Sequence, residues 1–202
     1  MWVVKLGGSL SRDPLLKDWL ECLLETGGGR VVIVPGGGAF ADQVRTHQAH
    51  WHFDDLAAHN MAILAMAQYG IMLRSICPQL VPAPGDDEIR RALRKGRVPL
   101  WQPLALMRDT PDELTHWGAT SDSLSAWLAK RLHAERLVLV KACPVDAEAT
   151  LASHIAAGIV DQSFDAFTRD AHYATDVVGK SDLRQIRALL RAAVPARHPF
   201  NP

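Results

Sequence analysis

Excess charge, paired cysteines and long apolar segments are all missing from this sequence. Its 202 residues carry 22 Lys and Arg against 22 Asp and Glu, so the formal net charge is zero. Nucleic-acid-binding proteins usually have a basic surplus or a basic stripe, so we expect no nucleic-acid partner. The three cysteines, Cys22, Cys77 and Cys143, lie far apart in the chain. They predict buried thiols in a reducing compartment, and neither a disulfide framework nor a zinc site.

Signals for membranes and for secretion are missing as well. The longest apolar runs are short, so we expect no membrane partner. The first residues, Met1 to Lys5, lead directly into a strand pattern and lack the basic and then apolar layout of a signal peptide. These features predict a cytoplasmic protein.

What the sequence does contain is a regular alternation of short apolar runs with helical patterns. Apolar residues make up 48% of the chain, which is enough for a substantial core. We predict strands over residues 2–6, 30–34, 80–83, 98–102, 136–141 and 173–178. We predict helices over residues 14–25, 39–47, 55–75, 87–95, 121–133, 147–157 and 181–193. This alternation is typical of a parallel sheet with helices on both faces, so we expect a doubly wound α/β fold with one domain over residues 1–202.

The first motif with chemical meaning ends the first predicted strand. Lys5 is followed, after one residue, by Gly7, Gly8 and Ser9. Glycine lets the backbone turn sharply and brings its N–H groups close to a bound oxyanion, and the lysine adds a point charge for the same phosphate. The alternative, for this motif taken alone, is an ordinary glycine turn with a solvated lysine.

A second glycine loop follows the next predicted strand. Gly36, Gly37 and Gly38 lead into the helix that we expect from residue 39. Backbone N–H groups at a helix N-terminus, beside the carboxyl end of a parallel strand, form an anion site. Two such loops could hold two phosphates facing each other, an arrangement that suits phosphoryl transfer. A purely structural turn is again the alternative.

A polar helix start supplies a carboxylate at the same end of the predicted sheet. Thr120 or Ser121 can cap the helix predicted from residue 121, and Asp122 then lies in its first turn. We expect Asp122 to hold Lys5 in place or to help bind Mg²⁺. The alternative is a capping motif whose acid is favoured by the helix dipole. His116 comes shortly before this segment.

Lys141 and Asp146 frame the exit of a later strand. Lys141 ends a buried predicted strand, and Asp146 follows it in a proline turn. Both residues are candidates for contact with a nucleotide base or ribose. A plain strand exit is the alternative.

Two competing nucleotide motifs fit the sequence poorly. Gly36, Gly38 and Ala41 match a dinucleotide-binding fingerprint, but the acids Asp54 and Asp55 open a helical stretch and do not end a strand. A P-loop that ended in Gly179-Lys180-Ser181 would need glycine at position 174, where this chain has alanine.

A group of histidines raises the question of a metal site. His47, His50, His52 and His59 lack the pair spaced four residues apart that a helical zinc site needs, so we expect no protein metal site. His59 and Asn60 lie just inside the helix after the second glycine loop. We therefore predict that these two residues contact the substrate.

Taken in order, residues 4–9, 35–38 and 120–124 resemble the amino acid kinase superfamily. This superfamily includes acetylglutamate, aspartate, uridylate, carbamate and isopentenyl phosphate kinases, and the resemblance extends over residues 2–192. Within it, residues 35–45, 116–125 and 160–164, together with the short chain, are most similar to the aminomethylfuran phosphate kinases of methanofuran biosynthesis.

The resemblance implies a three-layer αβα sandwich with a mainly parallel sheet, with ATP over the C-terminal strands and the acceptor over the N-terminal ones. It implies ATP and Mg²⁺ as cofactors and Lys5 and Asp122 as catalytic residues. The phosphate- and nucleotide-binding residues that we predict are Gly7, Gly8, Ser9, Lys141, Asp146, Gly179 and Lys180. The substrate-binding residues that we predict are Gly36, Gly37, Gly38, His59, Asn60, His116, Thr120 and Ser121.

The chain departs from the family pattern in its nucleotide half. Many members carry a second active-site lysine in a Gly-Gly-Met-x-x-Lys segment before the last strand, whereas residues 160–167 contain no lysine here. Arg169, Lys141 and Lys180 are the candidates to replace its charge. The usual Val-Asp-Gly turn has alanine at position 147 in place of glycine.

We therefore expect an ATP-dependent kinase that converts a small phosphate monoester to a diphosphate. One alternative is a kinase of the same fold that acts on isopentenyl phosphate, an amino-acid carboxylate or a nucleoside monophosphate. The other is a non-catalytic homologue that binds a nucleotide or an oxyanion. The apolar, methionine-bearing helix over residues 55–75 predicts a homo-oligomer.

Overall fold

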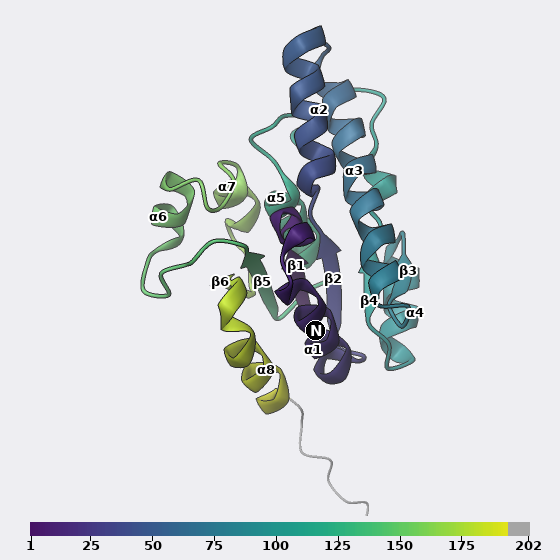
Figure 1. The fold of residues 1–202 in the computed structure, drawn as a ribbon, viewed down its shortest axis with the longest axis vertical. Helices are drawn as coiled ribbons and strands as arrows, with labels where there is room; N and C mark the ends of the chain where they lie inside the picture. Colours follow the sequence, from purple (N-terminus) through teal and green to yellow (C-terminus); the bar gives the residue numbers. More distant parts are fainter. Residues whose placement is uncertain (194–202) are drawn as a thin grey trace, which may run out of the picture.

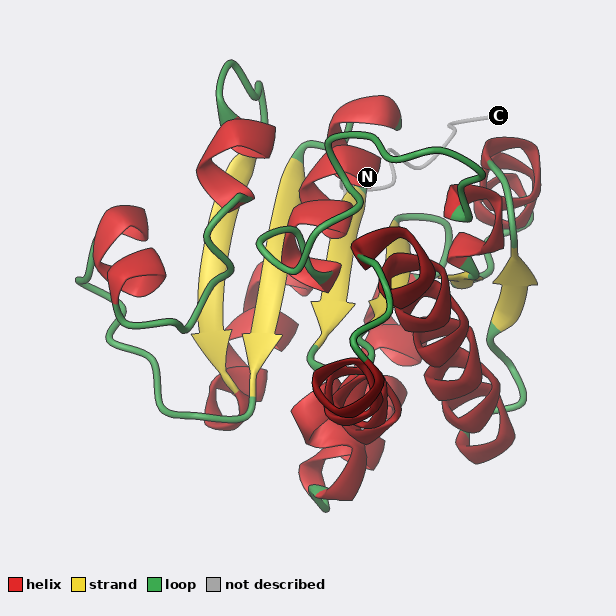
Figure 2. Ribbon diagram, turned by 90° about the horizontal axis from the view of Figure 1, so that it is seen from above, coloured by secondary structure: helices red, strands yellow, loops and turns green. Residues whose placement is uncertain are grey.

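A parallel sheet forms the centre of the computed structural model, which describes residues 1–193 (Figures 1 and 2). Its six strands have the order β3-β4-β2-β1-β5-β6, and every neighbouring pair is parallel. The strands are β1 (Trp2–Leu6), β2 (Val31–Pro35), β3 (Val81–Ala83), β4 (Pro99–Trp101), β5 (Arg136–Lys141) and β6 (Ala174–Gly179). The strand order reverses at β1, so β1, β2 and β5 end side by side at one edge of the sheet. Ligands of open α/β sheets bind at such a reversal point.

Helices lie on both faces of this sheet (Figure 2). They are α1 (Leu15–Gly27), α2 (Gly38–Trp51), α3 (Asp55–Ile76), α4 (Asp86–Arg94), α5 (Ser121–Arg131), α6 (Leu151–Ala156), α7 (Phe164–Thr168) and α8 (Leu183–Ala192). Three short 3-10 turns complete the elements: η1 (Gly8–Arg12), η2 (Pro103–Leu106) and η3 (Lys180–Asp182). The predicted α/β class and the sandwich of helices around a parallel sheet are confirmed.

The alternation of side chains along the central strands creates two cores. On β1, Val4 faces a cluster that includes Trp19 of α1 and Ile186 of α8. Val3 faces the opposite cluster, which includes Leu128 of α5. Because both faces are covered, the strand is apolar at successive positions and shows no alternation with polar residues.

Helix α3 reaches both cores. Ile63 in its first half joins the cluster with α5, and Tyr69 and Leu73 in its second half join the cluster with α1. Its length and composition would also allow it to cross a membrane, a feature that the sequence reading missed. Core helices of soluble proteins can have the same length and composition. The two clusters bury one side of α3, whereas Leu64 and Ile71 on the same helix are exposed.

Most predicted elements match the structure, with differences at helix ends. The helix expected over residues 147–157 begins only at Leu151, because Thr150 caps it through an acceptor bond from the Ser153 backbone N–H. Asp146 takes part in the preceding turn, where its Oδ1 accepts from the Glu148 backbone N–H. Helix α7 was not predicted, since five residues are too few for a periodic pattern.

Candidate active site

The two glycine loops lie against each other at the edge where β1 and β2 end. The backbone N–H of Gly36 donates to the carbonyl of Leu6, at 3.0 Å. A Cβ atom added to Gly8 would come within 1.9 Å of the Gly38 nitrogen, and one added to Gly36 within 2.4 Å of the Gly8 nitrogen. Only glycine allows the two backbones to approach this closely.

This contact brings two sets of backbone N–H groups to one place. Gly8 opens the turn η1 after β1, and Gly38 opens α2 after β2. Gly38 also has a positive φ of 55°, which favours glycine over any other residue. Helix starts at the carboxyl ends of parallel strands attract phosphate groups, so the paired loops form a candidate anion cradle.

A buried carboxylate joins two lysines beside the cradle. Lys5 Nζ lies 2.7 Å from Asp122 Oδ1, and Lys141 Nζ lies 2.5 Å from Asp122 Oδ2. The three residues come from β1, α5 and β5 and are only 5%, 3% and 9% exposed. Two cations therefore share one anion, and this cluster carries a net positive charge.

Burial and mutual charge set the proton affinities of this cluster. Burial favours the neutral form of Asp122, but the charges of Lys5 and Lys141 outweigh it and hold the pKa of the carboxyl below its ordinary value. Burial and the neighbouring charge of Lys5 lower the pKa of Lys141 to about 8, against the opposing effect of Asp122. Asp122 is thus a weak base.

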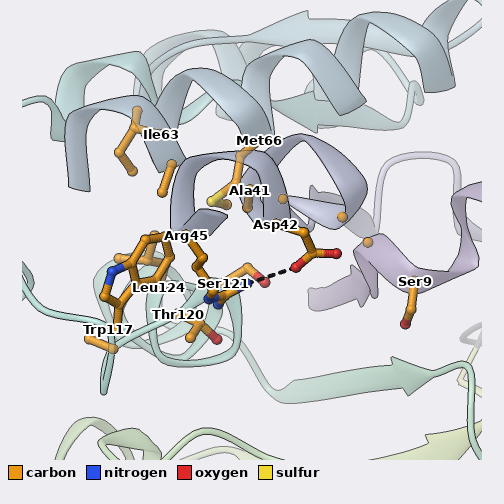
Figure 3. Close-up of a pocket in the computed structure, with 15 residues that line it drawn as sticks. Ser9, Ala41, Asp42, Arg45, Ile63, Met66, Trp117, Thr120, Ser121 and Leu124 are labelled. Carbon is orange, nitrogen blue, oxygen red and sulfur yellow. Dashed lines mark hydrogen bonds and ion pairs between the residues drawn. The ribbon is translucent and has the colours of Figure 1, made fainter. Parts of the chain in front are cut away.

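A cavity of about 220 Å³ opens beside the cradle (Figure 3). One side has the backbone of Gly8, Gly37 and Gly38 together with Ser9. The opposite side is apolar and combines residues of α3 and α5 with the loop before α5: Ala62, Ile63, Met66, Trp117, Ala119 and Leu124. Thr120 and Ser121, two of the residues that we predict to bind the substrate, also line it.

Arg45 and Asp42 of α2 add charge to this cavity. The Arg45 guanidinium lies 4.3 Å from the centre of the Trp117 ring, and it pairs with Asp42 at 2.9 Å. Figure 3 shows these side chains together beside Ser121. The cavity therefore joins an anion cradle, an apolar wall and a single arginine.

A second cavity, of about 590 Å³, adjoins the first. Asp122 and Lys141 line it, together with the segment from Gly158 to Gln162. Trp117 and Thr120 line both cavities. The residues before α5 therefore border both spaces, and the lysine–carboxylate cluster faces the second one through Asp122 and Lys141.

Three predicted substrate contacts have other partners. His59 is buried, and its Nε2 lies 2.9 Å from the carbonyl of Leu106. Asn60 donates to the Arg108 carbonyl and accepts from the Arg108 N–H, each at 2.8 Å. His116 Nδ1 accepts from the Gly118 N–H. These side chains fix the loop between β4 and α5, and none of them lines the first cavity.

Of the predicted nucleotide contacts, some lie at the cluster and others lie away from it. Lys141 joins the cluster at Asp122, which is a more central position than the base or ribose contact that we expected. Lys180 pairs with Asp13 at 2.5 Å, and Asp146 is exposed. Gly179 donates its N–H to Asp182. None of Asp146, Gly179 and Lys180 lines the cavity that contains Asp122.

Sequence reasoning missed several residues of the two cavities. Arg45 lies one helical turn after Ala41, so the face of α2 that starts at the glycine loop could have indicated it. Trp117 follows the predicted contact His116 but is not among the predicted site residues. Asp161 accepts hydrogen bonds from Thr120 and Ser123 across about forty residues of chain, and no local pattern marks such a contact.

Comparison with models of known protein families identifies the family of this chain. The model of the amino acid kinase family matches residues 1–145, which include both glycine loops, Asp122 and Lys141. The chain belongs to the amino acid kinase family.

The sequence is similar to that of a characterised enzyme, the [5-(aminomethyl)furan-3-yl]methyl phosphate kinase of Methanocaldococcus jannaschii. The two are 30% identical over 141 residues, which cover 69% of this chain and 64% of the relative. The match thus spans slightly less than two thirds of the relative's length.

Two solved kinase structures share the fold. The uridylate kinase of Archaeoglobus fulgidus superposes with a TM-score of 0.70 at 18% identity, covering 94% of this chain and 95% of that one. An isopentenyl phosphate kinase superposes with a TM-score of 0.61 at 14% identity, covering 95% and 96%. At these identities the comparison shows the amino acid kinase fold and nothing narrower.

The close approach of the loops predicts that Gly38 is less tolerant of a side chain than Gly96. Both glycines have positive φ, 55° and 68°, but a Cβ at Gly38 would meet the Gly8 carbonyl oxygen at 2.7 Å, while one at Gly96 meets nothing within 4 Å. We expect Gly38→Ala to lower the free energy of unfolding by at least about 1 kcal/mol more than Gly96→Ala. Urea unfolding of both variants measures this difference, and equal losses would contradict the proposed crowding.

Proposed function

We propose that this protein is an ATP-dependent kinase that phosphorylates a small phosphate monoester to a diphosphate. The observation that carries the proposal is the buried cluster of Lys5, Asp122 and Lys141, which lies beside the first glycine loop and lines a larger cavity through Asp122 and Lys141. Two cations and converging backbone N–H groups are the means by which proteins stabilise a phosphoryl group in transfer. The family name and the kinase named among the relatives support the same chemistry.

The two cavities suggest how the substrates are arranged. The larger one, lined by Lys141 and the segment from Gly158 to Gln162, has room for a nucleotide. The smaller one holds the paired glycine loops and Ser9. With ATP in the larger cavity and the acceptor in the smaller one, the terminal phosphate of ATP would lie near Lys5 and face the acceptor beside the start of α5.

The charge state of the cluster indicates the kind of nucleophile. A hydroxyl acceptor needs a base to remove its proton. Asp122 serves poorly as that base, because both of its oxygens are bonded to lysines and its pKa is lowered. A phosphate monoester is largely ionised at neutral pH and supplies its own oxyanion. The site therefore fits an acceptor that is already an oxyanion.

The phosphoryl group passes directly from ATP to the acceptor, without a covalent enzyme intermediate. An oxygen of the acceptor phosphate forms a bond to the γ-phosphorus of ATP, while the bond from that phosphorus to the β,γ-bridging oxygen breaks and ADP leaves. Charge on the moving group is met by Lys5, Lys141 and the N–H groups of the glycine loops. Asp122 keeps the two ammonium groups apart and oriented.

Magnesium fits this site as a partner of the phosphates. Within residues 1–193, no three His, Cys, Asp or Glu side chains gather in a metal-binding group. Mg²⁺ usually keeps several waters and binds through substrate phosphates with few protein ligands. When bound with ATP it would supply charge neutralisation at the phosphates.

The first cavity also bears on the choice of acceptor. Its apolar wall of Ile63, Met66 and Leu124, with the Trp117 indole, suits a small ring better than a strongly polar chain. The relative from Methanocaldococcus jannaschii is named for a phosphate ester on a furan ring. We therefore place the furan phosphates first among the acceptors and C1-carrier cofactor synthesis first among the pathways.

The deciding measurement is release of ADP from Mg-ATP with a panel of acceptors. The panel contains aminomethylfuran phosphate, isopentenyl phosphate, uridylate, acetylglutamate and carbamate, each with product analysis by mass spectrometry. Turnover with the furan phosphate supports the proposal, and turnover only with another acceptor retains the kinase and rejects the substrate. ATP binding without turnover on any acceptor would favour a non-catalytic nucleotide-binding protein.

Removing the charge of Lys5 should reduce catalysis without unfolding the protein. We expect Lys5→Met to lower kcat at least about tenfold, because a cation that meets the transferred phosphoryl group is lost. Lys17→Met is the control, since Lys17 is exposed and, within residues 1–193, its one ion pair is with Glu21 at 3.7 Å. Steady-state rates and circular dichroism test both variants. Unchanged turnover in Lys5→Met would remove Lys5 from the site.

Lys141 should give the reaction an alkaline limit. Its pKa is lowered to about 8, so its charge is present below that pH and is lost as the pH rises through it. We expect kcat to fall above about pH 8 in the wild-type protein, whereas Lys141→Arg should lack this limb because arginine keeps its charge. The pH profile of kcat measures both. An identical limb in the arginine variant would assign the titration to another group.

A further inference from the structure

Asp161 makes four hydrogen bonds to the start of α5. Its Oδ2 accepts from the Thr120 N–H and hydroxyl, both at 2.8 Å, and from the Ser123 N–H at 3.0 Å. Its Oδ1 accepts from the Ser123 hydroxyl at 2.5 Å. Both carboxylate oxygens are therefore occupied by protein donors.

These bonds clamp the residue that holds the two lysines. Asp122 lies between Thr120 and Ser123 in the first turn of α5. The local cap is weak, since the bond from the Asp122 N–H to Thr120 Oγ1 is 3.5 Å long. Helix starts need acceptors for their free N–H groups, and Asp161 supplies that acceptor from a segment 38 positions away from Ser123.

We propose that Asp161 is a positioning residue of the phosphoryl-transfer site, which fixes the first turn of α5 so that Asp122 stays between Lys5 and Lys141. This inference rests on the kinase function proposed above. It also gives a role to the segment around residues 160–162, which lines the larger cavity but contains no lysine. Here the second cation comes from the end of β5, and this segment contributes an anion that orders the site.

Asp161 has a second effect, on charge. The charged groups that act on Lys141 are Lys5, Asp122 and Asp161, and of these the two carboxylates favour its protonated form. Loss of the Asp161 charge should therefore make Lys141 deprotonate at a lower pH. A residue with a purely structural role would not shift this titration.

The test compares Asp161→Asn with Asp165→Asn. Asp165 belongs to the same segment but is exposed, and in the described part of the chain its side chain pairs with Arg169 alone, at 3.4 Å. We expect Asp161→Asn to lower kcat roughly tenfold or more, because small displacements of catalytic groups are costly, with KM for ATP changed by less than about threefold. The fall of kcat at alkaline pH should begin at a lower pH in Asp161→Asn. In Asp165→Asn, both kcat and its pH profile should match those of the wild type. Wild-type kcat and an unmoved limb in a folded Asp161→Asn protein would overturn the proposal.

A second measurement does not depend on turnover. The Lys141 titration can be followed by NMR of ¹³C-labelled lysine side chains, with the signal assigned by its loss in Lys141→Met. We expect the Lys141 midpoint to fall in Asp161→Asn and to stay in place in Asp165→Asn. If the wild-type protein turns over no acceptor, the kinase proposal fails while this shift still tests the positioning of the cluster. An unshifted Lys141 signal would overturn the role of Asp161 even in an active kinase.

A double-mutant cycle with Ser123→Ala separates the clamp from general destabilisation. Ser123 is fully buried and bonds Asp161 through its hydroxyl and its N–H. If the two residues act together, Asp161→Asn should lower kcat by a smaller factor in the Ser123→Ala background than in the wild type. Equal factors in both backgrounds would show that the side chains act independently and would contradict the clamp.

Discussion

The contact on which the site depends is the sharing of Asp122 by Lys5 and Lys141. Removing three charged groups from water costs several kcal/mol per ion before their attraction is counted, so such a cluster is weak evidence for stability. Its arrangement is better explained by binding. One anion holds two cations at 2.7 and 2.5 Å, fixed in the same small volume, and Lys141 lines the larger cavity. In the function that we propose, the surplus positive charge meets a phosphate.

The sheet makes this cluster possible because its central strands end at one edge. β1 pairs with β2 on one side and with β5 on the other, all in parallel. Lys5 and Lys141 lie near the ends of β1 and β5, and the glycine loops follow β1 and β2. The backbone contact of Gly8 with Gly38 then sets the distance between the two loops. The lysine–carboxylate cluster and the glycine loops are therefore positioned by the same strands, and a shift of β1 would disturb both.

Local patterns predicted the strands and the glycine loops because those features depend on neighbouring residues. Every predicted strand lies within one residue of its observed bounds at each end. The roles of polar side chains depended on distant partners, and there the sequence was a poorer guide. His59 and Asn60 bind the backbone of the loop at Leu106 and Arg108, more than forty residues away. Asp161 and Lys180 likewise meet partners that no spacing in the sequence indicates.

The role that we propose for Lys141 would account for one departure of this chain from the family pattern, the absence of a lysine from residues 160–167. A phosphoryl-transfer site needs positive charge at a fixed place, and the strand or loop that supplies it can differ. Lys141 lies at the end of a central strand, where the backbone is rigid and its neighbours are buried. With that cation on the sheet, the segment around residue 161 is free to carry an acid. Asp161 accepts hydrogen bonds from the start of α5 and so helps to fix Asp122, although the segment itself has no lysine.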